Sequence, residues 1–262
     1  MNTKTLSKTA LDMIDQYKNF QIGNAICSIP YFNNKRIAKR AGLRELIGKG
    51  SPKDIWSEVE HILTINKIDR KVINSENLVK ILVDNNIGID CSGYVFYILN
   101  EESKSREKGT LDRHLSFPYG MGIFGKIKSR IRPVENTDVR TFAHNKNSKI
   151  IEIKDIQVGD IIVMINSASN DSVDRIRDHI ALIYQIEYQN FVPVTLHYTH
   201  SVAWPTDGEY GHGIHDGRID ITDINKTIIE QRWNELGKND AENYTFMRAK
   251  ISTTELRRLN WF

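Results

Sequence analysis

The chain has 262 residues, and 40 % of them are hydrophobic, a composition typical of a globular protein with one sizeable core. Its 36 basic and 33 acidic residues leave a net charge of only +3, which does not favour nucleic acid as a partner. The mean hydropathy is −0.43, and no stretch approaches the roughly 18 consecutive apolar residues of a membrane span. The two cysteines, Cys27 and Cys91, are too few for a disulfide scaffold or a four-cysteine zinc site.

Residues 1–84 are predicted to form a helical region that precedes the main domain. Apolar residues recur at helical spacing in four segments, at 9–17, 37–47, 52–63 and 75–83. Seven basic residues and one acidic residue lie between residues 35 and 53. Such a run usually faces water, but it also fits a surface that binds an anionic polymer. We therefore expect these helices to carry a basic face.

Residues 85–262 are predicted to form an α+β core. A buried helix begins at Cys91, and a polar, irregular insertion follows from about residue 100 to 147. A further helix is expected at 227–236. Strands are expected at 150–153, 161–165, 179–186, 192–199, 219–221 and 244–251. A chain in which helices come first and an antiparallel meander follows is typical of an α+β fold.

The segment Gly-Ile-Asp-Cys-Ser-Gly-Tyr-Val at 88–95 carries the most chemical information. A cysteine in the first turn of a helix lies at the positive end of the helix dipole, which favours the thiolate, and backbone N–H groups there can stabilise an oxyanion. A lone cysteine is more often a small buried apolar residue. Two histidines favour catalysis instead, because His179 in one strand can serve as the base and His200 in the next can orient it.

These segments resemble the NlpC/P60 family of papain-like cysteine peptidases. The matching residues are Asp90-Cys91-Ser92-Gly93-Tyr94-Val95, Gly159-Asp160, Asp178-His179-Ile180-Ala181-Leu182-Ile183 and Thr199-His200-Ser201. The resemblance implies a papain-like fold in which the nucleophile helix packs on an antiparallel sheet, with the N-terminal helices as an addition. It also implies a triad of Cys91, His179 and His200 and no cofactor. Members of the family usually cleave amide bonds in peptidoglycan stem peptides.

The resemblance also suggests residues that contact the substrate. Tyr31, in a Pro-Tyr pair, matches a tyrosine that shapes the site, although an ordinary core tyrosine is as good an interpretation. Asp90 matches an aspartate that binds a substrate amine, and it can also cap the helix. Ser92 is small enough to let the substrate approach the backbone. Trp204, four residues after His200, is a candidate for lining a substrate groove.

The third member of the triad has an alternative. His197 and His200 are three residues apart and point to opposite faces of a regular strand. We expect His200, because His-Ser closes this strand in the family, and His197 is the fallback. The pairs His197/His200 and His212/His215 also suggest a zinc site. However, two residues three apart in a strand point to opposite faces and cannot bind the same ion, so no metal is expected.

The sequence thus predicts a cysteine hydrolase that cleaves an amide bond in a peptidoglycan stem peptide or muropeptide through an acyl-enzyme. An acyltransferase or thioesterase on the same fold is one alternative. A binding module for cell-wall or phosphate polymers, with an unreactive cysteine, is another. No apolar h-region precedes residue 20, so we expect no Sec signal peptide and either a cytoplasmic location or export by an unconventional route.

Overall fold

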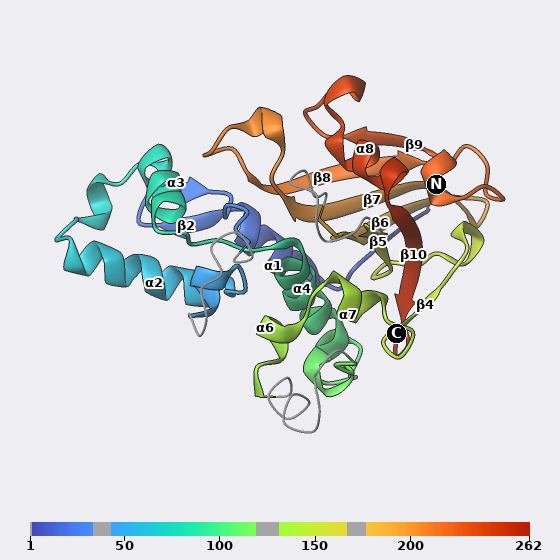
Figure 1. Cartoon of the computed structure of the whole chain (residues 1–262), viewed down its shortest axis with the longest axis horizontal. Coiled ribbons are helices and arrows are strands. Elements are labelled where there is room, and N and C mark those ends of the chain that lie inside the picture. The colour runs from blue at the N-terminus through green and yellow to red at the C-terminus, as the bar shows by residue number, and fades with distance from the viewer. Residues whose placement is uncertain (1, 34–42, 119–130, 167–176) are drawn as a thin grey trace.

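An antiparallel sheet forms one half of the molecule, and helices from the N-terminal part of the chain pack against it (Figure 1). The computed structural model describes residues 2–33, 43–118, 131–166 and 177–262. Within these ranges the strand order is β4-β10-β5-β6-β7-β8-β9, and β1 pairs with the far part of β6. The strands are β1 (Asn2–Thr5), β4 (Ser148–Ile150), β5 (Ile161–Ile165), β6 (His179–Gln189), β7 (Val192–Val202), β8 (Gly213–Asp220), β9 (Arg232–Glu235) and β10 (Thr253–Leu259).

The central strand β5 is apolar along its whole length because both of its faces are buried. Ile161 and Val163 of β5 pack into one core, and Ile162 and Met164 pack into a second core on the opposite face. Successive side chains of a strand point to opposite faces, so a continuous apolar run fills both layers. The first core lies between the sheet and the two helices α1 (Lys8–Lys18) and α4 (Cys91–Ser105).

The remaining N-terminal elements lie beyond α1 and α4, at the end of the molecule away from β10 (Figure 1). A capping box at Ser51 and Asp54 starts the longest of these helices, as the Ser-Pro pair predicts. These elements are α2 (Pro52–Ile65), α3 (Ser75–Asp84) and the hairpin of β2 (Phe20–Ile22) and β3 (Ala25–Cys27). No helix in the described ranges is both long enough and apolar enough to cross a membrane.

The α+β class and the large antiparallel sheet are confirmed, while several predicted elements are wrong. Residues 244–251 form a helix, α8 (Tyr244–Ile251), instead of a strand. Its buried residues Thr245 and Ala249 are four apart, which is helical spacing, and the Asn243 side chain caps it by accepting from the Phe246 N–H. The sequence signal for a helix was therefore present, but the apolar content suggested a strand.

The helix predicted at 227–236 is also wrong. A capping box between Thr227 and Glu230 begins only one 3₁₀ turn, and β9 follows directly. Trp233 and Glu235 point inward from this strand, two residues apart. The helix predicted at 37–47 lies partly outside the described residues, and its last part is a 3₁₀ turn (Arg44–Ile47).

The N-terminal strand β1 was not anticipated from the sequence. It extends the sheet of the C-terminal part, although the division at residue 84 stays a prediction. Within the insertion predicted at 100–147, α4 continues to Ser105. Two short helices then follow the undescribed segment, namely α6 (Pro133–Asn136) and α7 (Val139–Ala143).

A glycine on β8 makes room for a buried tyrosine of β7. Gly217 lies opposite Tyr198, and a Cβ atom built on Gly217 would be 2.2 Å from Cζ of that ring. Tyr198 cannot move aside freely, because its ring is fully buried and its hydroxyl donates to the Glu235 carboxylate at 2.6 Å. Gly217 therefore fixes where the tyrosine hydroxyl lies.

Gly217→Ala is expected to lower the free energy of unfolding by about 1–3 kcal/mol, the usual cost of overpacking a core. Chemical denaturation measures this difference. Arg218→Ala is the matched control, since Arg218 is the next residue along β8 and is exposed; it should change stability by less than about 0.5 kcal/mol. Equal effects of the two substitutions would show that Tyr198 is not held in place by this contact.

Candidate active site

Cys91 is the first residue of α4 and lies against the start of β6. The Asp90 side chain caps the helix by accepting from the Gly93 N–H at 2.6 Å. Cys91 is only 5 % exposed, and the backbone N–H of Ile180 acts to lower the pKa of its thiol. Ile180 directly follows His179, so the thiol lies beside the end of β6 that carries this histidine.

A buried lysine fixes the start of α4, the helix that begins at Cys91. The ammonium group of Lys49 donates three hydrogen bonds, to Asp90 Oδ1 at 2.9 Å, to Ser92 Oγ at 2.6 Å and to the Thr137 carbonyl at 2.8 Å. These bonds connect the turn before α2, the first turn of α4 and the α6–α7 connection. The ammonium also places a positive charge next to the carboxylate that lies nearest to the thiol.

Three side chains from β6, β7 and β9 form a hydrogen-bonded chain. His179 Nε2 lies 2.7 Å from His200 Nδ1, and His200 Nε2 lies 2.9 Å from Glu235 Oε1. The side chains of His200 and Glu235 have no exposed surface. The second carboxylate oxygen of Glu235 accepts from the Tyr198 hydroxyl. The carboxylate therefore has a partner on each oxygen, as a buried charge requires.

This chain determines the tautomer of both histidines when they are neutral. A carboxylate accepts only, so His200 carries its proton on Nε2 and presents an unprotonated Nδ1 to His179. His179 then donates from Nε2, and its own Nδ1 is left without a proton. Burial and the Glu235 charge raise the pKa of Tyr198 well above its ordinary value, so that its hydroxyl stays a donor. The result is a base nitrogen on His179 that is free to take a proton.

Burial favours the neutral forms of both reacting groups. It raises the pKa of the Cys91 thiol to about 12, with help from the Asp90 charge and against the effects of Lys49, the Ile180 N–H and Arg248. The pKa of His179 lies well below its ordinary value because of burial and the nearby Arg248. Burial thus outweighs the lowering of the thiol pKa that was expected from the helix N-terminus. Both shifts favour the uncharged forms of the two groups.

The fallback residue His197 lies apart from this chain. Its Nε2 is 2.8 Å from Glu187 Oε1, and both side chains are partly exposed. Residues three apart in a strand point to opposite faces, so His200 lies on the other face of β7 from His197. On that face it forms a hydrogen bond with His179. The structure thus brings His179 and His200 together and leaves His197 out.

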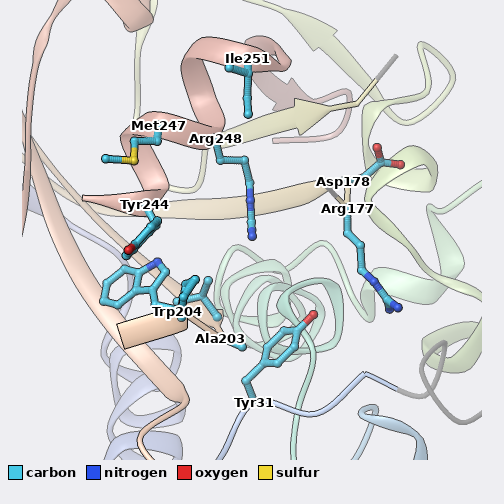
Figure 2. A pocket seen from close by; sticks show the side chains of 11 residues that line it. Tyr31, Arg177, Asp178, Ala203, Trp204, Tyr244, Met247, Arg248 and Ile251 are labelled. Atoms are coloured by element: carbon cyan, nitrogen blue, oxygen red, sulfur yellow. The ribbon is translucent and has the colours of Figure 1, made fainter. Parts of the chain in front are cut away.

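Tyr31 forms a β-bridge with Ile89, two residues before Cys91, although 60 residues separate Tyr31 from Cys91 in the sequence. Its neighbours hold it there: the Ile89 N–H donates to the Pro30 carbonyl at 3.0 Å, and the Phe32 N–H donates to the Ile89 carbonyl at 3.2 Å. Tyr31 and Trp204 line the same pocket of about 420 Å³ (Figure 2). Both predicted positions thus border one hollow, although neither Cys91 nor His179 is among its lining residues.

The other two residues predicted to contact the substrate, Asp90 and Ser92, already form hydrogen bonds within the protein. Asp90 Oδ1 accepts from Lys49, from the Ser92 hydroxyl and from the Gly93 N–H. Ser92 Oγ accepts from Lys49 in turn. The substrate-amine role of Asp90 stays a prediction, and any amine would have to share the carboxylate with an internal ammonium group.

Sequence reasoning missed Glu235, Lys49 and Arg248. Glu235 fell in a segment predicted to be helical, and Arg248 in one predicted to be a strand. Lys49 was only one of many basic residues between 35 and 53. The inward position of Glu235 could have been found from its two-residue spacing from Trp233, because both point into the core from β9. For Lys49 no local sequence signal marks a buried position.

The buried histidines make stability depend on pH. Burial lowers the pKa of His179 well below 6.5 and that of His215 to about 4, whereas both titrate near 6.5 when unfolded. Between about pH 6.5 and 4 the unfolded chain binds more protons, so the free energy of unfolding should fall as the pH falls. The slope approaches about 1.4 kcal/mol per pH unit for each group.

Urea denaturation at a series of pH values measures this slope. His215→Asn should make it shallower, and His61→Asn, at an exposed position of α2, should leave it unchanged. A slope that does not differ between His215→Asn and the parent protein would contradict the buried, neutral state of His215.

Comparisons of the chain with protein-family models, with curated proteins and with solved structures found no match. Overall similarity therefore neither supports nor contradicts the resemblance that the short motifs suggest. What the site does has to be inferred from its geometry: a thiol at a helix N-terminus, and a histidine on β6 that is linked to a buried carboxylate by two hydrogen bonds.

Proposed function

We propose that this protein is a papain-like cysteine hydrolase of the NlpC/P60 type, which cleaves an amide bond in a peptidoglycan stem peptide or muropeptide. The observation that carries the proposal is the chain from His179 through His200 to Glu235, which starts at the end of β6 where Ile180, the residue after His179, acts on the Cys91 thiol through its backbone N–H. The choice of a peptidoglycan peptide rests on the resemblance of the Asp-Cys-Ser-Gly and Asp-His-Ile-Ala segments.

In the proposed reaction the sulfur of Cys91 attacks the amide carbonyl while His179 Nδ1 takes the thiol proton. The oxyanion that forms accepts from the backbone N–H of Cys91, because the first N–H groups of a helix have no partner within the helix. His179 then returns the proton to the leaving amine as the C–N bond breaks. Water, deprotonated by the same nitrogen, releases the acid from the thioester and restores the thiol.

Glu235 supports this cycle through His200. When His179 takes the proton it becomes a cation in a buried site, which is costly without a counter-charge. His200 accepts the Nε2 hydrogen bond of that cation, and the Glu235 carboxylate stabilises the positive charge across the pair. The neutral resting state and the charged intermediate thus use the same hydrogen bonds.

A binding module with an unreactive cysteine is the second candidate. The observation that favours it is the burial of Cys91, which raises the pKa of the thiol to about 12. The two candidates differ in whether His179 controls the reactivity of the thiol. Cys27 provides an internal standard, because burial also raises its pKa to about 12.

Iodoacetamide is expected to alkylate Cys91 at pH 7.5 at least tenfold faster than Cys27, because only Cys91 has a neighbouring base. Mass spectrometry of the two peptides gives both rates in one sample. His179→Ala should remove the difference, and Cys91→Ala should abolish hydrolysis of muropeptides without a change in the circular dichroism spectrum. Equal alkylation of the two cysteines, or full activity of Cys91→Ala, would favour the binding module.

If amines added to the digest are acylated instead, the protein is an acyltransferase.

Glu235→Gln keeps the shape of the side chain and removes its charge. We expect kcat to fall about 10–100-fold with little change in KM, as for other residues that orient a reacting histidine through hydrogen bonds. Glu187→Gln is the matched control, because Glu187 makes the same contact with His197 at 2.8 Å on the other face of the sheet. Equal effects of the two substitutions on kcat would contradict the role given to Glu235.

A further inference from the structure

The tip of the β6–β7 hairpin exposes an aromatic side chain in a strained turn. Asn190 and Phe191 have φ angles of 50° and 66°, and two positive angles in a two-residue hairpin loop define a type I′ turn. The second position is usually glycine, because a side chain there clashes with the backbone. Phe191 is nevertheless 94 % exposed, so packing within the described structure does not compensate for the strain. A residue that costs stability and packs against nothing points to a contact outside the chain.

A basic hollow adjoins this tip. It has a volume of about 720 Å³ and lies between β1, the far end of β6 and residues 149–157. Tyr188 forms part of its wall, and Phe191 follows three residues later, so the tip lies within about 10 Å of the hollow. The basic residues that line the hollow are Lys4, Lys149, Lys154 and Arg258.

Two of these four cations are neutralised within the protein. Arg258 binds the Asp160 carboxylate at 2.7 Å, and Lys154 lies 2.6 Å from Glu152. The pair with Asp160 is largely buried and holds β10 against the start of β5, which gives Arg258 a structural role. The capacity of the hollow to bind an anion therefore depends on the other two cations.

Lys4 and Lys149 are both exposed and free to bind an anion. Lys4 lies over the ring of Tyr188, 5.3 Å from its centroid, and within the described part of the chain neither lysine pairs with a carboxylate. Asp155 and Glu152 are the acidic residues at the hollow, so basic residues outnumber acidic ones there by four to two. The hollow thus keeps an excess of positive charge.

Exposed apolar side chains accompany these charges. Val192 directly follows Phe191 in the hairpin and is half-exposed, and Ile150 is exposed beside Lys149 at the hollow. At a bilayer surface, apolar side chains enter the boundary between headgroups and acyl chains, while lysines stay among the headgroup phosphates. The mixture of apolar and basic residues fits such a surface.

Other partners account for only part of this surface. A dissolved polyanion would use the lysines but would gain nothing from Phe191. A protein partner is matched less well, because lysine is depleted in protein–protein interfaces and one protruding side chain covers little of the area that a stable complex needs. A bilayer uses both features at once.

We propose that the hairpin tip and the basic hollow bind the surface of an anionic membrane, with Phe191 and Val192 in the interface and with Lys4 and Lys149 on the headgroup phosphates. This surface lies at the opposite end of β6 from His179, about 30 Å away along the strand. No residue of the Cys91 site takes part in it, so the proposal is independent of the function proposed above.

Sedimentation of the whole chain with vesicles tests this surface. Vesicles of phosphatidylcholine with about 30 % phosphatidylglycerol carry the negative charge, and vesicles of phosphatidylcholine alone are the neutral reference. We expect binding to the anionic vesicles to be at least about tenfold tighter and to weaken as salt is raised above about 0.1 M. Equal binding to both kinds of vesicle, or no binding to either, would overturn the proposal.

Phe191→Gly separates a lipid contact from a structural role. Glycine adopts the positive φ angle without strain, so the free energy of unfolding should rise in urea denaturation. The same change removes the side chain that enters the interface, so binding to anionic vesicles should weaken about tenfold or more. Val72→Ser is the matched control, because Val72 is 72 % exposed and lies between α2 and α3, at the end of the molecule away from β4 (Figure 1). It should leave binding unchanged, and equal losses from the two substitutions would contradict the role of Phe191.

The double variant Lys4→Gln and Lys149→Gln tests the charges. Binding to anionic vesicles should weaken about tenfold or more and lose most of its dependence on salt. Lys53→Gln with Lys71→Gln removes the same charge from exposed positions in and after α2 and should bind as the parent does. An equal loss from both double variants would show that net charge alone drives binding, which would overturn the site. Tight binding of soluble polyphosphate without binding to vesicles would assign the hollow to a dissolved polymer and would also overturn it.

Discussion

The buried carboxylate of Glu235 is the charge on which the arrangement of the site depends. It lies on β9, at the edge of the sheet, yet it controls a histidine on β6 through His200 on β7. A buried carboxylate is tolerated only when its oxygens are paired, and Tyr198 and His200 supply these partners. Gly217 in turn leaves the space that Tyr198 needs. The sheet thus links His179, His200 and the Glu235 carboxylate through hydrogen bonds across its strands.

Lys49 plays the corresponding part for the nucleophile. It brings three segments of the chain together at the first turn of α4, and it offsets the charge of Asp90 next to the thiol. Two buried ionic groups therefore border the reacting pair, one on the helix side and one on the sheet side. Arg248 faces the pocket from α8, and within the described residues it forms no ion pair with a carboxylate.

The sequence predicted the parts of the site that are encoded in short segments. Asp90 and Cys91 are adjacent and form a helix N-terminus, and His179 and His200 each belong to a segment whose apolar pattern predicts a strand. The local sequence pattern was therefore sufficient to predict these four site residues. Glu235 and Arg248 could not be found in this way, since their segments were assigned to the wrong kind of element. Lys49 could not be found either, because its partners Asp90 and Thr137 are 41 and 88 residues away in the chain. Contacts of that range are set by the tertiary fold.

The position of the proton on His179 tests the central claim most directly. Long-range ¹H–¹⁵N correlation spectra at pH 7.5 distinguish the two neutral tautomers of each histidine. We expect both His179 and His200 to be neutral with the proton on Nε2, which leaves Nδ1 of His179 unprotonated and able to accept the proton of Cys91. A proton on Nδ1 of His179 would contradict this arrangement, because the nitrogen needed as the base would then be a donor.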